Sequence, residues 1–243
     1  MAEKGAQLYE GKAKKIFEVV GDPTKVIQQY KDDATAFNAQ KRGTIAGKSV
    51  VNAKMTAMIF KMLEAEGIKN HLIELLNDTD LLTHKVSIVP LEVVIRNIMA
   101  GSLAKRLGIA EGTPLKTPIY DIHYKEDKLD DPLVSEYQAE ALGWATRPEL
   151  DQIRGMALRV NQILKVFFDK MGITLVDFKL EFGRLPSGEI ILADEISPDT
   201  CRFWDKATGE KLDKDRFRRD LGNVEGAYQE MLKRVSGALS GVK

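Results

Sequence analysis

The sequence feature that most constrains the fold is a regular alternation of apolar and charged residues in LVDFKLEFG, at residues 175–183. Its charged members, Asp177, Lys179 and Glu181, are separated from one another by single apolar residues. Successive side chains of a β-strand point to opposite faces, so the segment predicts one strand with an apolar face and an acid–base–acid face. A turn at GRLPSG and the apolar run EIILADE that follows it predict the second strand of an antiparallel hairpin.

This predicted hairpin brings several charged groups to one face. If the two strands pair around a closure at 183–190, Lys179 faces Asp194 and Glu181 lies diagonal to Asp194. Diagonal neighbours on a sheet stand ~7–8 Å apart, so two carboxylates and a lysine converge, which suits a divalent cation such as Mg²⁺. A shift of one residue in register would place Glu195 there instead. The alternative is a solvated sheet face that carries cross-strand ion pairs.

The rest of the chain predicts an α+β fold of two lobes, built from antiparallel sheets with packed helices. Residues 8–31 contain two apolar runs around the turn GDPTK, which favours antiparallel strands. Strands dominate the first third of the chain, and helices and the charged hairpin dominate the remainder. We therefore expect a mainly β lobe over residues 1–87 and an α+β lobe over residues 88–243.

Apolar residues at helical spacing predict three long helices. The first has Ser49 as its N-cap and Gly67 just after its end. The expected ranges of the three helices are about 49–65, 149–171 and 213–235.

Composition argues against several classes of protein. Lys plus Arg and Asp plus Glu each number 36 among 243 residues, so a basic footprint for nucleic acid is absent. Cys201 is the single cysteine, which leaves no disulfide framework within the chain. No apolar run approaches the ~18 residues of a transmembrane helix, and the N-terminus lacks the apolar core of a signal peptide. We expect a cytoplasmic protein that binds neither nucleic acid nor membranes.

The segment RGTIAGKS, at residues 42–49, resembles a phosphate-binding P-loop but departs from it. Only three residues separate Gly43 from Gly47, whereas the motif requires four, and no apolar strand precedes it. We interpret it as a turn that leads into a helix, or as a basic loop near an anionic ligand.

Two further segments carry groups that are typical of anion binding. In EGKAK, Lys12 and Lys14 lie on one side of an early strand beside Gly11, where the backbone can approach a nucleotide's phosphates. An exposed, lysine-rich edge strand is the alternative. In IRNIMAGSLAKRLG, Arg96 precedes Ser102 at a predicted helix N-terminus, which favours an anion such as phosphate. A plain serine cap is the alternative there.

Four segments occurring in order, LYEGKAK, PLEVVIRNIMAGSLAKRLG, LVDFKLEFG and ADEISPDTCRFWD, together resemble the SAICAR synthetase family from about Leu8 to Leu232. The resemblance implies an ATP-dependent ligase of purine biosynthesis. Its reaction joins L-aspartate to the carboxylate of carboxyaminoimidazole ribotide and yields the succinocarboxamide ribotide SAICAR, ADP and phosphate. It also implies a kinase-like, ATP-grasp-like arrangement with ATP between the lobes. We further expect Mg²⁺ as the metal and a homo-oligomer, in particular a homodimer.

The resemblance also implies roles for individual residues. Arg202, which could clamp a phosphate or carboxylate in bidentate fashion, falls in the ribotide group, and no catalytic role is carried over to Lys41, Arg42 or Lys48. The implied groups are Lys12, Lys14 and Ile88 for ATP; Glu181 and Asp194 for Mg²⁺; Arg96, Ser102, Asp131, Asp177, Asp199 and Arg202 for the substrate; and Asp177 and Lys179 as catalytic residues. Two alternatives remain open: a small-molecule kinase on the same scaffold, and a non-catalytic nucleotide-binding module.

Overall fold

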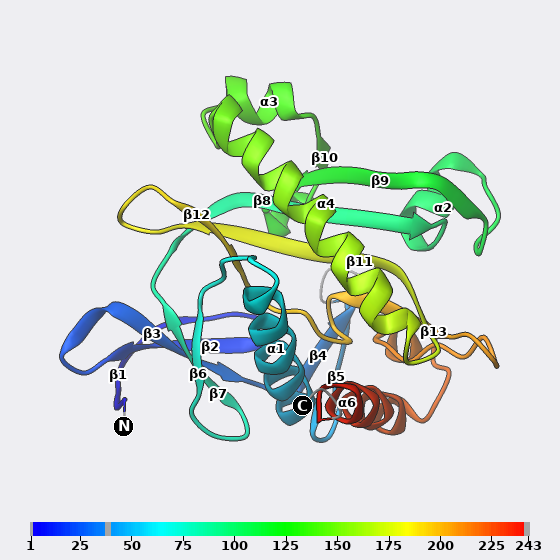
Figure 1. Ribbon diagram of the computed structural model, residues 1–243, viewed down its shortest axis with the longest axis horizontal. Coiled ribbons are helices and arrows are strands. Elements are labelled where there is room, and N and C mark those ends of the chain that lie inside the picture. Colours follow the sequence, from blue (N-terminus) through cyan, green and yellow to red (C-terminus); the bar gives the residue numbers. More distant parts are fainter. Residues whose placement is uncertain (1, 37–39, 241–243) are drawn as a thin grey trace.

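Two antiparallel sheets form the framework of the molecule (Figure 1). The computed structural model describes residues 2–36 and 40–240. Within these residues the first sheet has the strand order β1-β2-β3-β7-β6, and a separate hairpin pairs β4 with β5. The bounds of these strands are Lys4–Glu10 (β1), Lys14–Val19 (β2), Asp22–Tyr30 (β3), Asp33–Ala36 (β4), Lys41–Thr44 (β5), Leu72–Leu75 (β6) and Asp80–His84 (β7).

The second sheet is organised around one long strand, β11. The first half of β11 pairs with β13, its second half pairs with β12, and β8 pairs with it along the opposite edge. The loop between β12 and β13 therefore lies beside the middle of β11. The bounds of these strands are Ser87–Ile98 (β8), Pro114–Tyr124 (β9), Leu133–Val134 (β10), Ile173–Arg184 (β11), Ile190–Ala193 (β12) and Cys201–Asp205 (β13).

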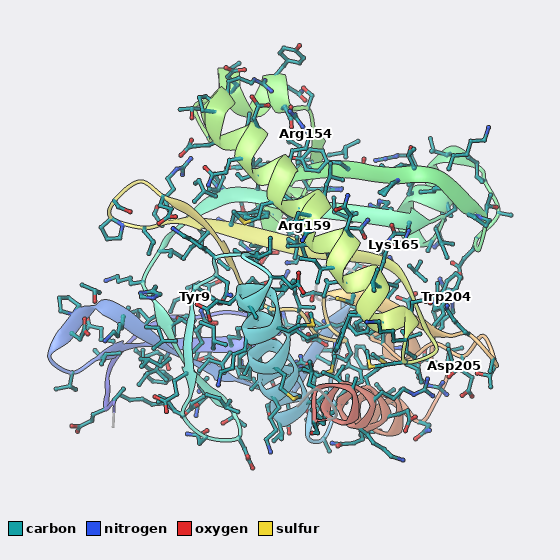
Figure 2. All side chains as sticks on the ribbon, viewed as in Figure 1. Tyr9, Arg154, Arg159, Lys165, Trp204 and Asp205 are labelled. Atoms are coloured by element: carbon teal, nitrogen blue, oxygen red, sulfur yellow. The ribbon has the colours of Figure 1, made fainter. Side chains whose placement is uncertain are left out.

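Helices pack against these sheets and against one another. The helix α4 lies across the second sheet and contacts β11 and β8, while α1 packs beside α6 (Figure 1). Arg154, Arg159 and Lys165 project from the outer side of α4 (Figure 2), opposite its buried apolar residues. The bounds are Lys48–Ala65 (α1), Gly101–Leu107 (α2), Asp127–Leu129 (η1, a 3₁₀ turn), Glu136–Ala141 (α3), Arg147–Asp169 (α4), Asp215–Arg218 (α5) and Val224–Ser240 (α6). None of the helices described is long and apolar enough to span a membrane.

The helix ends show where local sequence signals succeed and where they fail. α4 begins with a capping box in which Thr146 and Glu149 satisfy each other's backbone amides. Ser49, in contrast, does not cap α1, so that prediction is wrong. Gly47 holds the cap position, and the carboxylate of Asp32 accepts hydrogen bonds from the amides of Gly47 and Ser49 at 3.1 and 2.8 Å.

The last predicted helix, 213–235, is also wrong as a continuous element. The chain forms the short α5 and then α6, and the connection between them contains three residues with positive φ: Asp220, Gly222 and Asn223. A positive φ is incompatible with a right-handed helix, so the helix ends before these residues.

The register of the charged hairpin differs from the prediction by one residue. Glu181 pairs with Ala193, and β12 ends at that alanine. Asp194 has a φ of 60°, so the chain turns away from the strand and carries its carboxylate toward the middle of β11. The predicted alternation itself is confirmed, because Phe178 and Leu180 are buried in the apolar core while Asp177, Lys179 and Glu181 line a pocket.

The first sheet ends at His84 and the second begins at Ser87. One continuous cluster of buried apolar residues nevertheless includes members of both sheets and of α1, α4 and α6. The division into lobes at residues 87 and 88 stays a prediction.

Candidate active site

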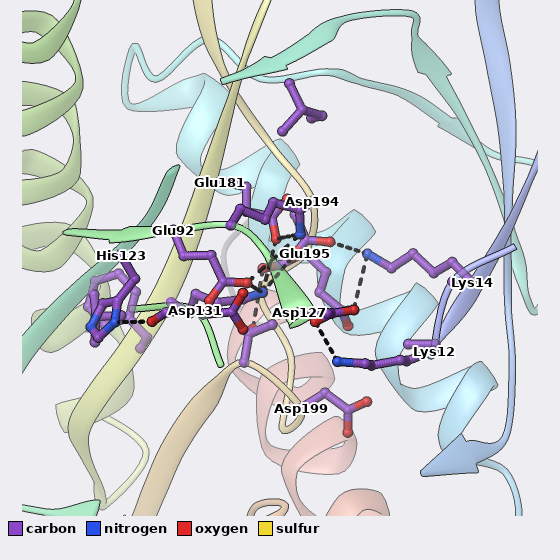
Figure 3. Close-up of a pocket in the computed structure, with 18 of the residues that line it drawn as sticks. Lys12, Lys14, Glu92, His123, Asp127, Asp131, Glu181, Asp194, Glu195 and Asp199 are labelled. Carbon is purple, nitrogen blue, oxygen red and sulfur yellow. Dashed lines mark hydrogen bonds and ion pairs between the residues drawn. The ribbon is translucent and has the colours of Figure 1, made fainter. Parts of the chain in front are cut away.

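A cavity of about 820 Å³ lies between the two sheets and gathers the predicted site residues in one place (Figure 3). Residues of β1, β2 and β3 line one side, and residues of β8 and β11 line the other. The predicted residues that line it are Lys12, Lys14, Ile88, Arg96, Ser102, Asp131, Asp177, Lys179, Glu181, Asp194, Asp199 and Arg202.

The charged face of β11 forms the floor of this cavity. Asp177 and Glu181 are each only 4% exposed, so the alternative of a solvated sheet face is wrong. The Lys179 Nζ atom lies 2.7 Å from Glu92, 2.9 Å from Glu181 and 3.9 Å from Asp194. Burial alone would lower the pKa of Lys179, but the three carboxylates outweigh it and hold that pKa well above its usual range. Lys179 therefore carries a fixed positive charge at the centre of the site.

Glu92 and Lys125 belong to this network, and the sequence reasoning missed both. Glu92 on β8 is the cross-strand partner of Glu181, and Lys125, just after β9, lies 2.7 Å from Glu181. The added positive charge offsets the repulsion between the two glutamates. A signal for Glu92 was present, because Glu92 and Arg96 lie four residues apart in a predicted strand and therefore share a face.

Lys14 joins the first sheet to the loop after β12. Its Nζ atom lies 2.5 Å from Asp194 and 3.0 Å from Glu195 (Figure 3), so the structure places both acids at the site. Burial works against the charge of Lys14, yet the two carboxylates raise its pKa. Burial likewise works against the Asp194 carboxylate, but Lys14, Lys179 and Lys125 hold the pKa of Asp194 well below its usual range.

Lys12 lies in the turn between β1 and β2 and not on the same strand as Lys14, which corrects the sequence interpretation. It pairs with Asp127 of η1 at 2.5 Å (Figure 3). Lys14 is the first residue of β2 and is buried, so the alternative of an exposed edge strand does not hold for it. The pair of Lys12 and Asp127 links the first sheet to the segment that follows β9.

One end of the cavity is apolar. Leu8, Ile16 and Val26 of the first sheet line it together with Val86 and Ile88. The connection between the sheets lies close against β11, because a Cβ atom on Gly183 would be 2.4 Å from the Val86 Cγ2 atom. Only glycine permits this approach. The apolar end thus has the character of a site for a flat heterocycle, next to the lysines of the first sheet.

The other end of the cavity is rich in arginine. Asp177 has Arg96 as its partner on β8 and Arg202 as its partner on β13. Arg202 donates to both oxygens of Asp177 at 2.8 and 3.0 Å and to Asp215 at 3.0 Å. Arg96 donates to Asp121 at 2.9 Å and approaches Asp177 at 3.5 Å. Asp121, Asp177 and Asp215 thus hold the guanidinium groups of Arg96 and Arg202 at the same end of the cavity.

The start of α2 approaches these arginines. Ala100, not Ser102, occupies the cap position, so the alternative of a plain serine cap is wrong. Gly101 has a φ of 58°, and a Cβ atom on it would lie 2.5 Å from the Arg202 Nη2 atom. Glycine is required here both for the backbone conformation and for the guanidinium packed against it.

Two buried side chains, Lys48 and Tyr228, hold the carboxylate of Asp199. Lys48 Nζ lies 2.8 Å from its Oδ2 atom, and the Tyr228 hydroxyl donates to its Oδ1 atom at 2.7 Å. Lys48 is fully buried, a placement that the sequence interpretation did not anticipate. Burial opposes the charge of Asp199, but Lys214, Lys48 and Tyr228 hold its pKa below the usual range.

Asp131 lines the pocket but also has a local role. Its carboxylate accepts from the amide of Glu126 at 3.0 Å, and its backbone carbonyl contacts His123 Nδ1 at 2.8 Å. These contacts stabilise the turn between β9 and β10.

The donor atoms suit a metal that is shared with a substrate. The described residues contain no cluster of three or more His, Cys, Asp or Glu side chains that could hold an ion by themselves. Glu181 and Asp194, however, approach one cation, the Lys179 ammonium, at 2.9 and 3.9 Å. Mg²⁺ typically takes one or two protein carboxylates and completes its shell with water and substrate phosphates. The two acids fit that requirement.

The fold and the site together define a protein that binds polyanions in a cleft between two antiparallel sheets, with a fixed ammonium between paired acids. Comparison with known proteins gives the family. The family model described as SAICAR synthetase matches residues 7–235. The chain belongs to the SAICAR synthetase family.

Individual relatives agree over nearly the full length. The phosphoribosylaminoimidazole-succinocarboxamide synthase of Clostridium botulinum is 59% identical over 234 residues, which cover 96% of this chain and 99% of the relative. The crystal structure of the Ehrlichia chaffeensis synthase superimposes with a TM-score of 0.93 at 47% identity, covering 95% of this chain and 98% of that one. A SAICAR synthetase solved in complex with ADP gives a TM-score of 0.91 at 49% identity, covering 94% and 97%.

Proposed function

We propose that this chain is an ATP-dependent ligase that joins L-aspartate to the carboxylate of carboxyaminoimidazole ribotide and releases SAICAR, ADP and phosphate in purine biosynthesis. The observation that carries the proposal is the buried acid–base–acid face of β11, which lies in a cation-lined cavity of a chain that belongs to the SAICAR synthetase family. ATP, the ribotide and aspartate are all anions, so an enzyme that brings them together must neutralise their mutual repulsion. Lysines and arginines from both sheets supply that neutralisation.

ATP binds at the apolar end of the cavity in this proposal. The adenine ring lies among the apolar side chains near Ile88, and the phosphates take Lys12 and Lys14 as partners. Support comes from the apolar residues Leu8, Ile16 and Val26, which line the same wall of the cavity as Lys12 and Lys14, and from the relative solved with ADP. The nucleotide thereby lies between an N-terminal lobe over residues 1–87 and a C-terminal lobe over residues 88–243.

The ribotide binds at the arginine-rich end. Arg96, Ser102 and Arg202 hold its phosphate, since guanidinium groups match phosphate oxygens in bidentate fashion. Asp177 keeps both arginines in place and lines the reacting end beside Lys179. Asp199 and Asp131 contribute acceptors for the hydroxyl and amino groups of the substrate. The ribotide carboxylate then faces the phosphate groups of ATP above β11.

The reaction needs activation because a carboxylate is a poor acylating agent, with oxide as its leaving group. An oxygen of the ribotide carboxylate attacks the terminal phosphorus of ATP, the bond to ADP breaks, and an acyl phosphate forms. The amine of aspartate attacks the acyl carbon, inorganic phosphate leaves, and the nitrogen loses a proton. Lys179, which stays protonated, directs its charge at the transferring phosphoryl group.

Glu181 and Asp194 would hold Mg²⁺ at this point. When bound, the ion supplies a Lewis acid for the phosphoryl oxygens. Glu92 and Lys125 fix the position of Glu181 and Lys179 through the network described above.

The test is phosphate release from the purified protein with ATP and Mg²⁺, with aspartate or ribotide omitted in turn. Release that requires both, together with formation of SAICAR, supports the ligase. Release with ribotide alone indicates that an acyl phosphate forms and hydrolyses. Transfer of phosphate to a hydroxyl without aspartate would identify a small-molecule kinase. Nucleotide binding without any turnover would identify a non-catalytic binding module.

We also propose that the enzyme acts in the cytoplasm, where charged nucleotides are retained, and that it forms a homodimer. Light scattering coupled to size-exclusion chromatography tests the dimer, since a chain of 27.1 kDa would then elute at twice its mass. A mass equal to one chain would refute it.

A further inference from the structure

Lys214 differs from the other buried lysines of the cavity in its partners. Lys14 and Lys179 each have a carboxylate oxygen within 3.0 Å. In the described chain the nearest carboxylate oxygen to Lys214 Nζ belongs to Asp199 and lies 3.8 Å away. The Lys214 side chain is only 14% exposed and lines the cavity. A buried ammonium without a close partner costs free energy unless an anion approaches it.

Asp199 does not supply that anion, because its oxygens have closer partners. Lys48 takes Oδ2 at 2.8 Å and the Tyr228 hydroxyl takes Oδ1 at 2.7 Å. The single carboxylate of Asp199 therefore lies between two buried ammonium groups, those of Lys48 and Lys214. The nearby Glu195 is engaged as well, by Lys14 at 3.0 Å and by the Ser197 hydroxyl at 2.6 Å.

The neighbourhood of Lys214 compensates its positive charge only in part. Arg218, one helical turn further along the chain, lines the same cavity and pairs with Asp215 at 2.7 Å. Burial first, and then the charges of Arg218 and Lys48, lower the pKa of Lys214 against the opposite effect of Asp199 and Glu195. The backbone amide of Lys214 donates to the carbonyl of Pro198 at 3.0 Å, which fixes the residue beside the loop that carries Asp199.

We infer that Lys214 is the residue that binds a carboxylate of the L-aspartate substrate. The inference rests on the proposed function, which assigns Lys12 and Lys14 to the ATP phosphates and Arg96 and Arg202 to the ribotide phosphate. Aspartate brings two carboxylates. Of the cavity cations that those assignments leave, Lys125 and Arg218 pair with Glu181 and Asp215 at 2.7 Å, and Lys85 is exposed. Lys214 supplies a cation that is buried, lies on the cavity wall and has no described carboxylate oxygen closer than 3.8 Å.

The test compares steady-state kinetics of the wild type with those of Lys214→Met, varying each of the three substrates in turn. Loss of a charge-assisted hydrogen bond raises the KM for aspartate roughly 10- to 100-fold. The KM values for ATP and ribotide stay within about twofold of the wild type. Lys214→Arg, which keeps the charge, recovers part of the lost affinity for aspartate.

A matched control is Lys206→Met, because Lys206 is an exposed lysine outside the cavity that pairs with Asp169. It should leave every KM unchanged. Thermal unfolding checks the fold, and Lys214→Gln serves in place of Lys214→Met if the methionine variant unfolds.

Three results separate the possibilities. An active variant with an unchanged KM for aspartate overturns the inference. A raised KM for the ribotide or ATP alone also overturns it and assigns Lys214 to a phosphate. Failure of the wild type to form SAICAR from all three substrates refutes the proposed function instead, so the two failures are distinguishable.

Discussion

Replacing Gly101 with alanine should damage the arginine-rich end of the cavity, and the structure gives the size of the effect. The added Cβ atom would lie 2.5 Å from Arg202 Nη2, whereas ordinary van der Waals contact begins near 3.4 Å. The guanidinium must therefore withdraw by about 0.9 Å, the difference between these two distances. That movement disturbs its hydrogen bonds to Asp177 and Asp215, which measure 2.8 to 3.0 Å.

Two costs follow from this displacement. The φ of 58° at Gly101 costs an alanine about 1–2 kcal/mol. A disturbed hydrogen bond between charged groups costs about 1.5–3 kcal/mol more. We expect the free energy of unfolding to fall by about 3 kcal/mol and the KM for the ribotide to rise ~100-fold, since a misplacement of about 1 Å has effects of that order.

Gly108→Ala is a matched control for Gly101→Ala. Gly108 ends the same helix with a φ of 65°, and nothing lies within 4 Å of its Cβ position. Gly108→Ala should lower the free energy of unfolding only by the cost of a positive φ in alanine, about 1–2 kcal/mol, and should leave the kinetics unchanged. Urea denaturation and steady-state kinetics on both variants make the comparison. Equal losses of stability and equal KM values for the two variants would refute the role assigned to Gly101 and to the position of Arg202.

Three further predictions concern the charged groups. Asp194→Asn and Glu181→Gln should each lose most turnover while the protein stays folded, because each removes a ligand proposed for Mg²⁺; wild-type-like turnover in both variants would end the metal-site hypothesis. Lys48→Met should lower the free energy of unfolding in urea by about 3 kcal/mol, because it deprives the buried carboxylate of Asp199 of its closest cation; a loss below about 1 kcal/mol would show that the remaining partners suffice. Burial raises the pKa of Asp213 to about 7, whereas an unfolded aspartate titrates near 4. The folded state thus holds the extra proton between these values, so the contribution of Asp213 to the free energy of unfolding should fall as the pH rises from about 4 to about 7. The difference in the free energy of unfolding between the wild type and Asp213→Asn should fall across that range, and a difference that does not change with pH would contradict the shift.

Local periodicity was sufficient to predict the most informative strand. The alternation in β11 is a property of neighbouring residues, so the sequence alone separated its apolar face from Asp177, Lys179 and Glu181. The antiparallel hairpin and the ranges of α1 and α4 were likewise predicted closely, because apolar spacing and glycine stops lie within each segment. The roles given to individual site residues stay predictions, although the residues themselves all line one cavity.

Features that depend on distant residues were not predicted. The carboxylate of Asp32, and not the Ser49 side chain, accepts from the first amides of α1. Glu92 on β8 and Lys125 just after β9 contact the network around Lys179. The register was wrong by one residue because the hairpin closes at Arg184 and Ile190, not at Gly183 and Ile190. Asp194, in addition, adopts a positive φ that ends β12 early. Aspartate adopts a positive φ more readily than most residues, but it does not predict one in a sequence as strongly as glycine does.

The ion pairs of the cavity have a consequence for how strongly it can hold its substrates. Lys12 is paired with Asp127, and Arg202 with Asp177, so a phosphate that binds either cation competes with a carboxylate of the protein itself. The affinity of the site for a phosphate is then the difference between the new ion pair and the protein's own ion pair that it replaces. It stays modest although many charges are involved. Raising the ionic strength weakens the old and the new pairs together. The site therefore distinguishes one anion from another by the spacing of its charges more than by their number.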